Sequence, residues 1–242
     1  MATAPFELMT TGEMKDLCSA AFQAVPSDLP RWLAKQWLCQ KGRLGEEITK
    51  IFLAGPFSDI NWQLTCEKLG MKAEAEAISK LVLPPANPAT WWVPMVEGVT
   101  SNRVVAGMRN LGVDYGLFDE DLDAAVPTHD RDPKNGSYVV GFRRTIEADE
   151  ENANKSVIQL AEQKHAGITL PERLWLGAGF FVATGQHLDT KKITLCSGSR
   201  AVSGGVPCVF FDLDYRRVVV YWYSPGHSSG RLRSRSVQFP LP

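Results

Sequence analysis

Cysteine is scarce in this sequence of 242 residues, and its five cysteines form no CxxC motif. An odd number of scattered cysteines is typical of reduced thiols, not of a disulfide framework, so we expect a cytoplasmic protein. The four histidines have no metal-ligand spacing with each other or with the cysteines. We therefore expect no bound metal and no cofactor.

Targeting and membrane-spanning patterns are missing as well. The N-terminal residues 1–7 contain neither a basic n-region nor an apolar h-region, which predicts no secretion signal. The uncharged run from Leu174 to His187 is too short to span a bilayer and indicates a core helix, so we expect no membrane partner. A net charge of −1 argues against a general nucleic-acid binder but allows a local basic patch.

The charge is unevenly distributed. From Thr190 to the end there are eight lysines and arginines against two aspartates, whereas residues 119–123 and 147–151 are acidic. Two solvated faces of one protein would explain this pattern. A basic surface that meets an anionic partner, protein or nucleic acid, would explain it too.

The first third of the chain has the periodicity of short helices. Thr10 and Glu13 form a capping box ahead of an amphipathic helix, and four further helical segments follow, the third near residues 46–53. These segments predict a helical bundle over residues 1–83. Three prolines within residues 84–88 predict an extended linker over residues 84–90.

Residues 91–242 mix helix and strand patterns and predict an α+β domain. A buried helix is expected from Leu170 to Thr184, closed by Gly185. An antiparallel sheet is expected from strands near 138–144, 192–196, 206–212 and 217–223, the last two joined as a hairpin. The predicted fold class is therefore α+β, with an N-terminal helical bundle.

The turn from Cys196 to Arg200 contains the candidate reactive residues. The Cys196 thiolate could act as a nucleophile, with His187 as the base and Asp189 to orient it. The alternation of residues 194–196 also fits a strand end, where Cys196 would be a packed core thiol. A third interpretation is an anion-binding nest formed by the amides of Ser197 and Ser199 with Arg200.

Four aspartates, Asp119, Asp121, Asp123 and Asp130, have the spacing of a calcium-binding loop. The sharp turn in such a loop needs glycine, but Ala124 occupies that position, and Pro127 interrupts the loop. A solvated acidic turn explains the run better than a metal site.

Aromatic and basic residues come together near the C-terminus. Residues 221–223 are Tyr-Trp-Tyr, which could stack on bases, and Arg231, Arg233 and Arg235 alternate with other residues. In an extended chain these three arginines would lie on one side and face an anionic partner. A sheet with one buried aromatic face and one wet basic face is the alternative.

Several segments also form a recognisable pattern: residues 92–98 (WVPMVEG), 185–189 (GQHLD), 194–200 (TLCSGSR), 219–226 (VVYWYSPG) and 232–237 (LRSRSV). Together they resemble uncharacterised bacterial proteins from candidate phyla, over about residues 91–237. The resemblance implies a bacterial or bacteriophage-like origin and a self-contained C-terminal module, and it implies no activity.

Three functions remain open from the sequence. The first is a non-enzymatic binding module that uses the basic C-terminal face. The second is a cysteine-dependent enzyme centred on Cys196 and His187. The third is a structural component of a bacterial or phage assembly, in which the chain would form a homo-oligomer or a larger complex.

Overall fold

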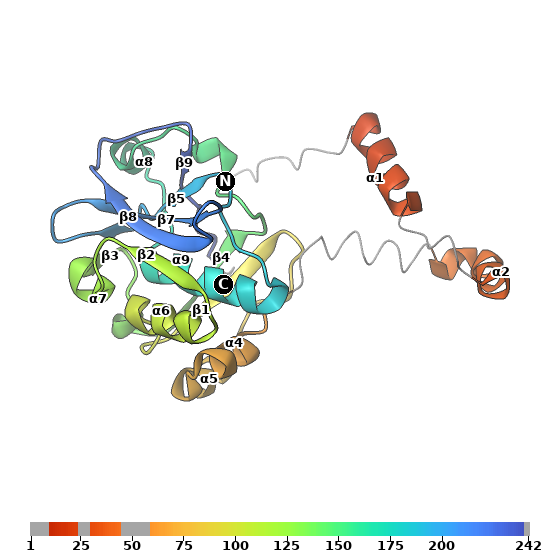
Figure 1. Ribbon diagram of the computed structural model, residues 1–242, viewed down its shortest axis with the longest axis horizontal. Helices are drawn as coiled ribbons and strands as arrows, with labels where there is room; N and C mark the ends of the chain where they lie inside the picture. Colours follow the sequence, from red (N-terminus) through yellow and green to blue (C-terminus); the bar gives the residue numbers. More distant parts are fainter. Residues whose placement is uncertain (1–9, 24–29, 45–58, 240–242) are drawn as a thin grey trace. The chain divides into compact units, whose positions relative to one another are not determined.

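A computed structural model of the protein describes residues 10–23, 30–44 and 59–239 (Figure 1). Contacts between Cα atoms divide the chain into two units, Met1–Leu53 and Ala54–Pro242. None of the helices in these described ranges is both long and apolar enough to cross a membrane.

The described part of the first unit consists of two helices, α1 (Thr11–Gln23) and α2 (Arg31–Cys39). Both were expected from the sequence. Pro30 lies at the N-cap of α2, where a missing amide hydrogen costs little. The predicted third helix near residues 46–53 falls outside the described residues, and the predicted bundle as a whole is not confirmed.

The second unit begins with α4 (Trp62–Leu69) and α5 (Lys72–Ser79). The Asn61 side chain accepts the Leu64 amide at the start of α4, and Gly70 ends it in the left-handed conformation. The sequence assigned both helices to the N-terminal bundle. In the structure Trp62, Cys66 and Leu69 belong to the hydrophobic core of the second unit. The observed division at Leu53 therefore differs from the predicted linker at 84–90.

A five-stranded mixed sheet forms the centre of the second unit. Its strand order is β2 (Asp114–Leu117), β8 (Arg217–Tyr223), β7 (Val206–Asp212), β5 (Ile193–Leu195) and β9 (Leu232–Arg233). The β7–β8 hairpin and the β5–β7 pair are antiparallel, as expected. The two edge strands pair in parallel, β2 with β8 and β9 with β5, which the sequence did not indicate.

Two smaller sheets complete the β structure. β1 (Thr90–Met95) pairs antiparallel with β4 (Tyr138–Arg143), and β3 (Thr128–His129) pairs antiparallel with β6 (Ser199–Arg200). The prediction that β4 belongs to the main sheet is wrong, because its partner is the tryptophan-rich strand β1. The remaining elements are α6 (Ser101–Asn110), α7 (Leu122–Ala125), η1 (Pro133–Asn135), η2 (Glu150–Asn152) and α8 (Val157–Glu162).

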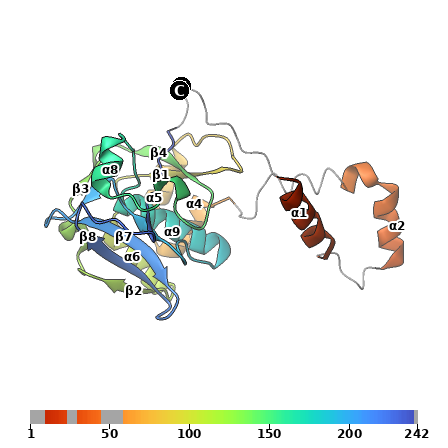
Figure 2. The same cartoon turned by 90° about the horizontal axis from the view of Figure 1, so that it is seen from above.

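The long helix α9 (Leu170–Thr184) has the predicted bounds. Thr169 and Glu172 form a capping box at its start, and Gly185 ends it with a φ of 70°. It packs against α4, α6, β1 and β7 in the main core. The short helix α8 covers the other face of the sheet through a second, smaller cluster (Figures 1 and 2). Burial on both faces explains why β5 and the first half of β7 are nearly continuous hydrophobic runs.

Candidate binding surface

A buried ion network lies between α9 and the C-terminal segment. Asp189 is fully buried, and its carboxylate contacts Arg173 at 2.7 Å and Arg235 at 2.8 Å. The Thr194 hydroxyl donates to the same carboxylate. Burial alone would raise the pKa of Asp189, but the two guanidinium groups and this hydroxyl hold it below its ordinary value. Asp189 is therefore the counterion of two arginines, and not an orienting residue for His187.

His187 lies in a cleft at the end of α9, with a volume of about 650 Å³. Its ring is stacked between Phe181 and Phe211, with ring centroids 4.8 and 4.0 Å away. Burial, with Arg173 nearby, lowers the pKa of His187 to about 4. A base with so low a pKa has little driving force to accept a proton at neutral pH.

Cys196 is fully buried in the main core, and its amide donates to the Pro207 carbonyl. Burial raises the pKa of its thiol well above the ordinary value, so the thiol stays protonated. Of the three predicted catalytic residues, none has both the exposure and the protonation state of a nucleophile or its base.

We expect the cysteines to differ sharply in alkylation rate. Cys18 and Cys39 are exposed, whereas Cys66, Cys196 and Cys208 are buried. Burial raises the pKa of Cys66 to about 11 and that of Cys208 to about 12. Mass spectrometry after iodoacetamide treatment of the folded protein should find label on the two exposed cysteines. Rapid labelling of Cys196 before unfolding would contradict the packing described here.

The turn that contains Ser197 and Ser199 uses its amides within the fold. The amides of Ser197, Gly198 and Ser199 donate to the carbonyls of Leu195, Ile168 and Cys196. The Arg200 guanidinium donates to two carbonyls of the same turn, both at 2.7 Å. These amides are therefore occupied, and the arginine stabilises the turn, so the geometry leaves little to hold an anion.

The three arginines of the tail do not share one exposed side. Arg231 is exposed, Arg233 is mostly covered near Glu150, and Arg235 is buried. The reason is that the segment after β9 pairs with residues 166–168 and, at Gln238, with Gly141 of β4. Ile168 donates to the Arg235 carbonyl, and the Val237 amide donates to Ala166. An extended chain with one free side, assumed in the sequence analysis, is absent there.

The acidic segment at residues 147–151 lies against this basic tail. Asp149 accepts the Ser236 amide at 2.7 Å, and the Asn152 amide group donates to the Ser234 carbonyl at 3.0 Å. Both side chains are buried. Glu150 also pairs with Arg233 at 3.5 Å, so part of the charge separation seen along the sequence is offset in space.

The acidic run near α7 caps two helices. Asp123 accepts the Ser101 and Asn102 amides at the start of α6, and Asp121 accepts the Ala124 amide of α7. In the ranges that the structure describes, no group of three acidic, histidine or cysteine side chains is arranged to hold a metal. Two of the four aspartates with calcium-like spacing therefore cap helices.

Three histidines are held in neutral form. The Ser199 hydroxyl oxygen accepts the Leu170 amide, so its own proton is free for Nδ1 of His129, 2.7 Å away. The Asn152 side-chain amide donates to Nε2 of His165 at 3.0 Å. Burial lowers the pKa of both histidines, as it does for His187.

Stability should therefore decrease as the pH falls below 6.5. Between pH 6.5 and about 4 the histidines bind protons in the unfolded chain but stay neutral in the folded protein. Proton binding therefore stabilises the unfolded state in this range and favours unfolding. His187→Phe keeps the aromatic stack and removes one titrating group. We expect its melting temperature to depend less on pH than that of the wild type. If the melting temperatures of the variant and the wild type changed equally with pH between pH 6.5 and 5, His187 would titrate normally in the folded protein.

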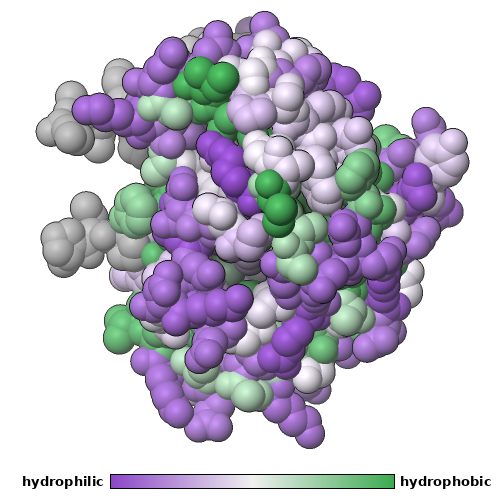
Figure 3. Space-filling view, turned by 90° about the vertical axis from the view of Figure 1, so that its left-hand side faces the viewer, coloured by the Kyte–Doolittle hydropathy of each residue, from purple (hydrophilic) through white to green (hydrophobic). Residues whose placement is uncertain are grey.

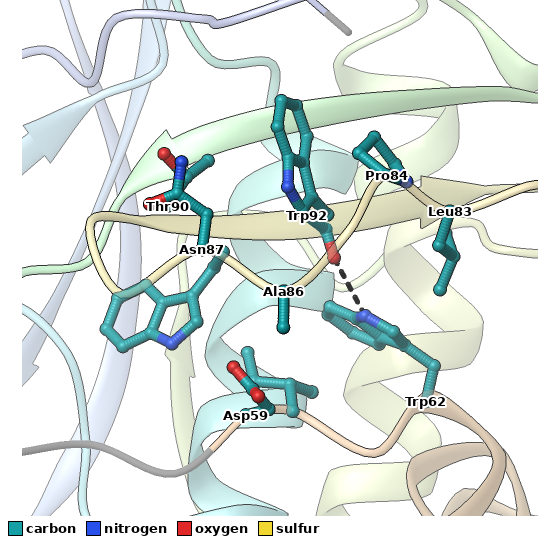
Figure 4. Close-up of a pocket in the computed structure, with 10 residues that line it drawn as sticks. Asp59, Trp62, Leu83, Pro84, Ala86, Asn87, Thr90 and Trp92 are labelled. Atoms are coloured by element: carbon teal, nitrogen blue, oxygen red, sulfur yellow. Dashed lines mark hydrogen bonds between the residues drawn. The ribbon is translucent and has the colours of Figure 1, made fainter. Parts of the chain in front are cut away.

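Two further clefts open on the second unit. One has a volume of about 160 Å³ and lies between the 83–92 segment and the start of α4. Trp62 lines this cleft, and its indole donates to the Trp92 carbonyl (Figure 4). The other, of about 520 Å³, is lined by Phe118, Trp222 and Val202 with part of α7.

The second of these clefts lies beside exposed aromatic side chains. Phe118, Tyr221, Trp222 and Val202 form what we call the aromatic surface. Phe118 is 58% exposed and Val202 is 76% exposed. The Phe118 ring meets Tyr221 edge-on at 5.2 Å and Trp222 at 4.4 Å. On one side of the molecule, Figure 3 shows hydrophobic side chains in small patches on a mainly hydrophilic surface.

The sequence identified only part of this surface. Tyr221 and Trp222 were candidates for stacking, but Phe118 and Val202 were not. Phe118 follows β2 directly and precedes the acidic run, and its amide donates to the Val220 carbonyl beyond the last paired residue of β2. The position of Phe118, an aromatic residue between a strand end and an acidic turn, is the sequence signal that could have identified it as a candidate surface residue.

Comparison with known proteins adds no assignment: no family model, no curated protein and no solved structure matches the chain. Its function is therefore inferred from the geometry of the described residues.

Proposed function

We propose that the protein is a non-catalytic binding module whose contact site is the aromatic surface. The exposure of Phe118 is the observation that carries this proposal. Isolated hydrophobic side chains are common on protein surfaces, but here Phe118 packs edge-on with two neighbouring aromatic rings beside a cleft of about 520 Å³. Clefts of this size are large enough to take a ligand or a peptide segment.

Energetics support a role in binding. Fully burying a large apolar side chain contributes about 1.5–3 kcal/mol, and tryptophan and tyrosine are enriched among the residues that dominate binding energy. Because the Phe118 ring is largely exposed in the free protein, it does not contribute this burial free energy there. A partner that covers Phe118, Tyr221 and Trp222 would recover it.

The two sites predicted from the sequence, the Cys196 turn and the basic tail, have less support. A cysteine-dependent reaction needs a thiolate, and the Cys196 thiol is buried with a raised pKa. The tail arginines predicted to bind an anionic partner are mostly covered by the chain's own carboxylates and carbonyls. For these reasons we place the contact site on β8 and the end of β2.

Selection from a displayed library of random peptides tests this proposal. Peptides selected on the wild-type protein should lose about tenfold or more in affinity for Phe118→Ala, a change of about 1.4 kcal/mol. Phe118 is largely exposed, so this variant should fold normally.

The matched control is Tyr215→Ala. Tyr215 is an aromatic residue that is 70% exposed, but it lies in the β7–β8 turn and does not line the cleft. Affinity for this variant should stay within about twofold of the wild type. Selected peptides that bind Phe118→Ala as tightly as the wild type would overturn the assignment of the site, as would a failure to select any peptide.

A further inference from the structure

The charge of the cleft beside Phe118 has only one sign. Two charged residues line it, Asp119 and Asp121, and the described lining contains no lysine or arginine. The other lining residues are small, apolar or aromatic, including Ala124, Val202 and Trp222. A ligand that fills this cleft therefore meets apolar walls with two carboxylates at the rim.

Each of these carboxylates is held in place by hydrogen bonds from the chain. Oδ1 of Asp119 accepts the Asp121 amide at 2.9 Å. Oδ1 of Asp121 accepts the Asn102 side-chain amide at 2.8 Å and the Ala124 amide at 3.1 Å. The Asp123 amide also contributes a hydrogen bond to the Asp121 carboxylate. The chain thus fixes the orientation of both carboxylates, and both line the cleft.

Neighbouring charges do not neutralise the two aspartates. The adjacent Glu120 forms its own ion pair with Arg109, at 2.9 Å. The Arg200 guanidinium is bound to the carbonyls of its own turn. The pKa of Asp121 is lowered, first by its hydrogen bond to Asn102, so it is ionised at neutral pH.

Aromatic rings complete the chemistry of the site. Guanidinium and ammonium groups are attracted to the faces of tryptophan, tyrosine and phenylalanine rings. The protein contains one such contact within the same hairpin, where the Arg217 guanidinium lies 4.9 Å from the Tyr215 ring centroid. A guanidinium can also stack flat on a ring while it donates to a carboxylate, which a compact ammonium group cannot do.

We infer that the aromatic surface binds a basic peptide segment by taking an arginine side chain into the cleft between Phe118, Trp222 and the two aspartates. The cleft volume of about 520 Å³ leaves room for a neighbouring apolar side chain of the same segment. This inference rests on the proposed binding function and specifies its partner. The expected ligand charge is the opposite of the anionic partner predicted from the sequence.

Nuclear magnetic resonance titration of the full chain provides the test. The probe is a short synthetic peptide with one arginine beside a leucine, compared with the same peptide in which citrulline replaces arginine. Citrulline has nearly the same shape and no charge. The arginine peptide should shift the Trp222 indole resonance and bind about tenfold or more tightly than the citrulline peptide.

The matched variants separate charge from shape. Asp119→Asn/Asp121→Asn keeps both capping oxygens and removes the charge, so it should lose about tenfold in affinity for the arginine peptide. Glu120→Gln changes a neighbouring carboxylate that does not line the cleft, and it should bind like the wild type. High salt should weaken wild-type binding and have little effect on the double variant.

Each contrary result has a distinct meaning. Equal affinity for both peptides, with loss on Phe118→Ala, would overturn the cationic ligand and leave the binding site in place. Arginine-dependent binding that is unchanged in Phe118→Ala would overturn both proposals. Absence of binding at millimolar peptide, or tighter binding of a neutral oligosaccharide at the same resonances, would overturn the inferred ligand class alone.

Discussion

Asp189→Asn is expected to lower the free energy of unfolding of the second unit by about 3–5 kcal/mol. Asparagine keeps the shape of the side chain and tolerates the left-handed backbone at this position, where φ is 57°. The substitution therefore isolates the charge. It leaves Arg173 and Arg235, both nearly fully buried, without their carboxylate.

Urea unfolding followed by circular dichroism measures this effect. Glu76→Ala is the control, because Glu76 pairs with Lys80 on α5 and both side chains are more than 70% exposed. An exposed helical ion pair contributes little to stability, so the control should stay close to the wild type. If the two variants were equally stable, the buried network would have no role in holding the fold.

Trp62→Ala is expected to have an effect of similar size, about 3–5 kcal/mol, on the same unfolding transition. Trp62 is buried, its ring lies 5.1 Å from that of Trp175 on α9, and its indole donates to the Trp92 carbonyl at 2.9 Å. Loss of the ring would leave a cavity and an unpaired carbonyl in the main core.

Trp37→Ala is the matched control for this substitution. Trp37 lies on α2 in the first unit and is only partly buried. Thermal unfolding of the second unit should be unchanged in this variant. An equal loss for both tryptophans would indicate one cooperative unit and would contradict a division at Leu53.

Local patterns predicted the elements that are stabilised locally. The bounds of α9 follow from its capping box and from Gly185, and the β7–β8 hairpin follows from two β-branched and aromatic runs joined by a polar turn. Parallel pairing has no such local mark, because the partner strand lies far away in the sequence. β2 pairs with β8 about a hundred residues later, and the sequence did not indicate it.

The candidate site was less predictable for the same reason. Asp189 was placed with His187 because they are neighbours in sequence, yet its carboxylate binds Arg235, 46 residues away. Arg233 was expected to face solvent, but its neighbour is Glu150, 83 residues away. Alternation along a strand shows which residues share a side, but it does not show what covers that side.

The proline-rich segment shows a similar limit of local patterns. Prolines at residues 84–88 indicate an extended segment, and the chain there has no helix or strand apart from an isolated bridge at Asn87. An extended segment separates two domains only if the residues on its two sides do not pack together. Here Trp62 and Trp91 belong to one core.

The buried position of Arg235 has a consequence for the order of synthesis. The Asp189 carboxylate and the Thr145 and Ile146 carbonyls are completed by a residue that the ribosome adds long after them. In a nascent chain that lacks Arg235, one oxygen of the buried Asp189 carboxylate and both of these carbonyls are without this donor. Because a buried acceptor without its donor costs free energy, we expect a chain that stops before Arg235 to be less stable than the full chain.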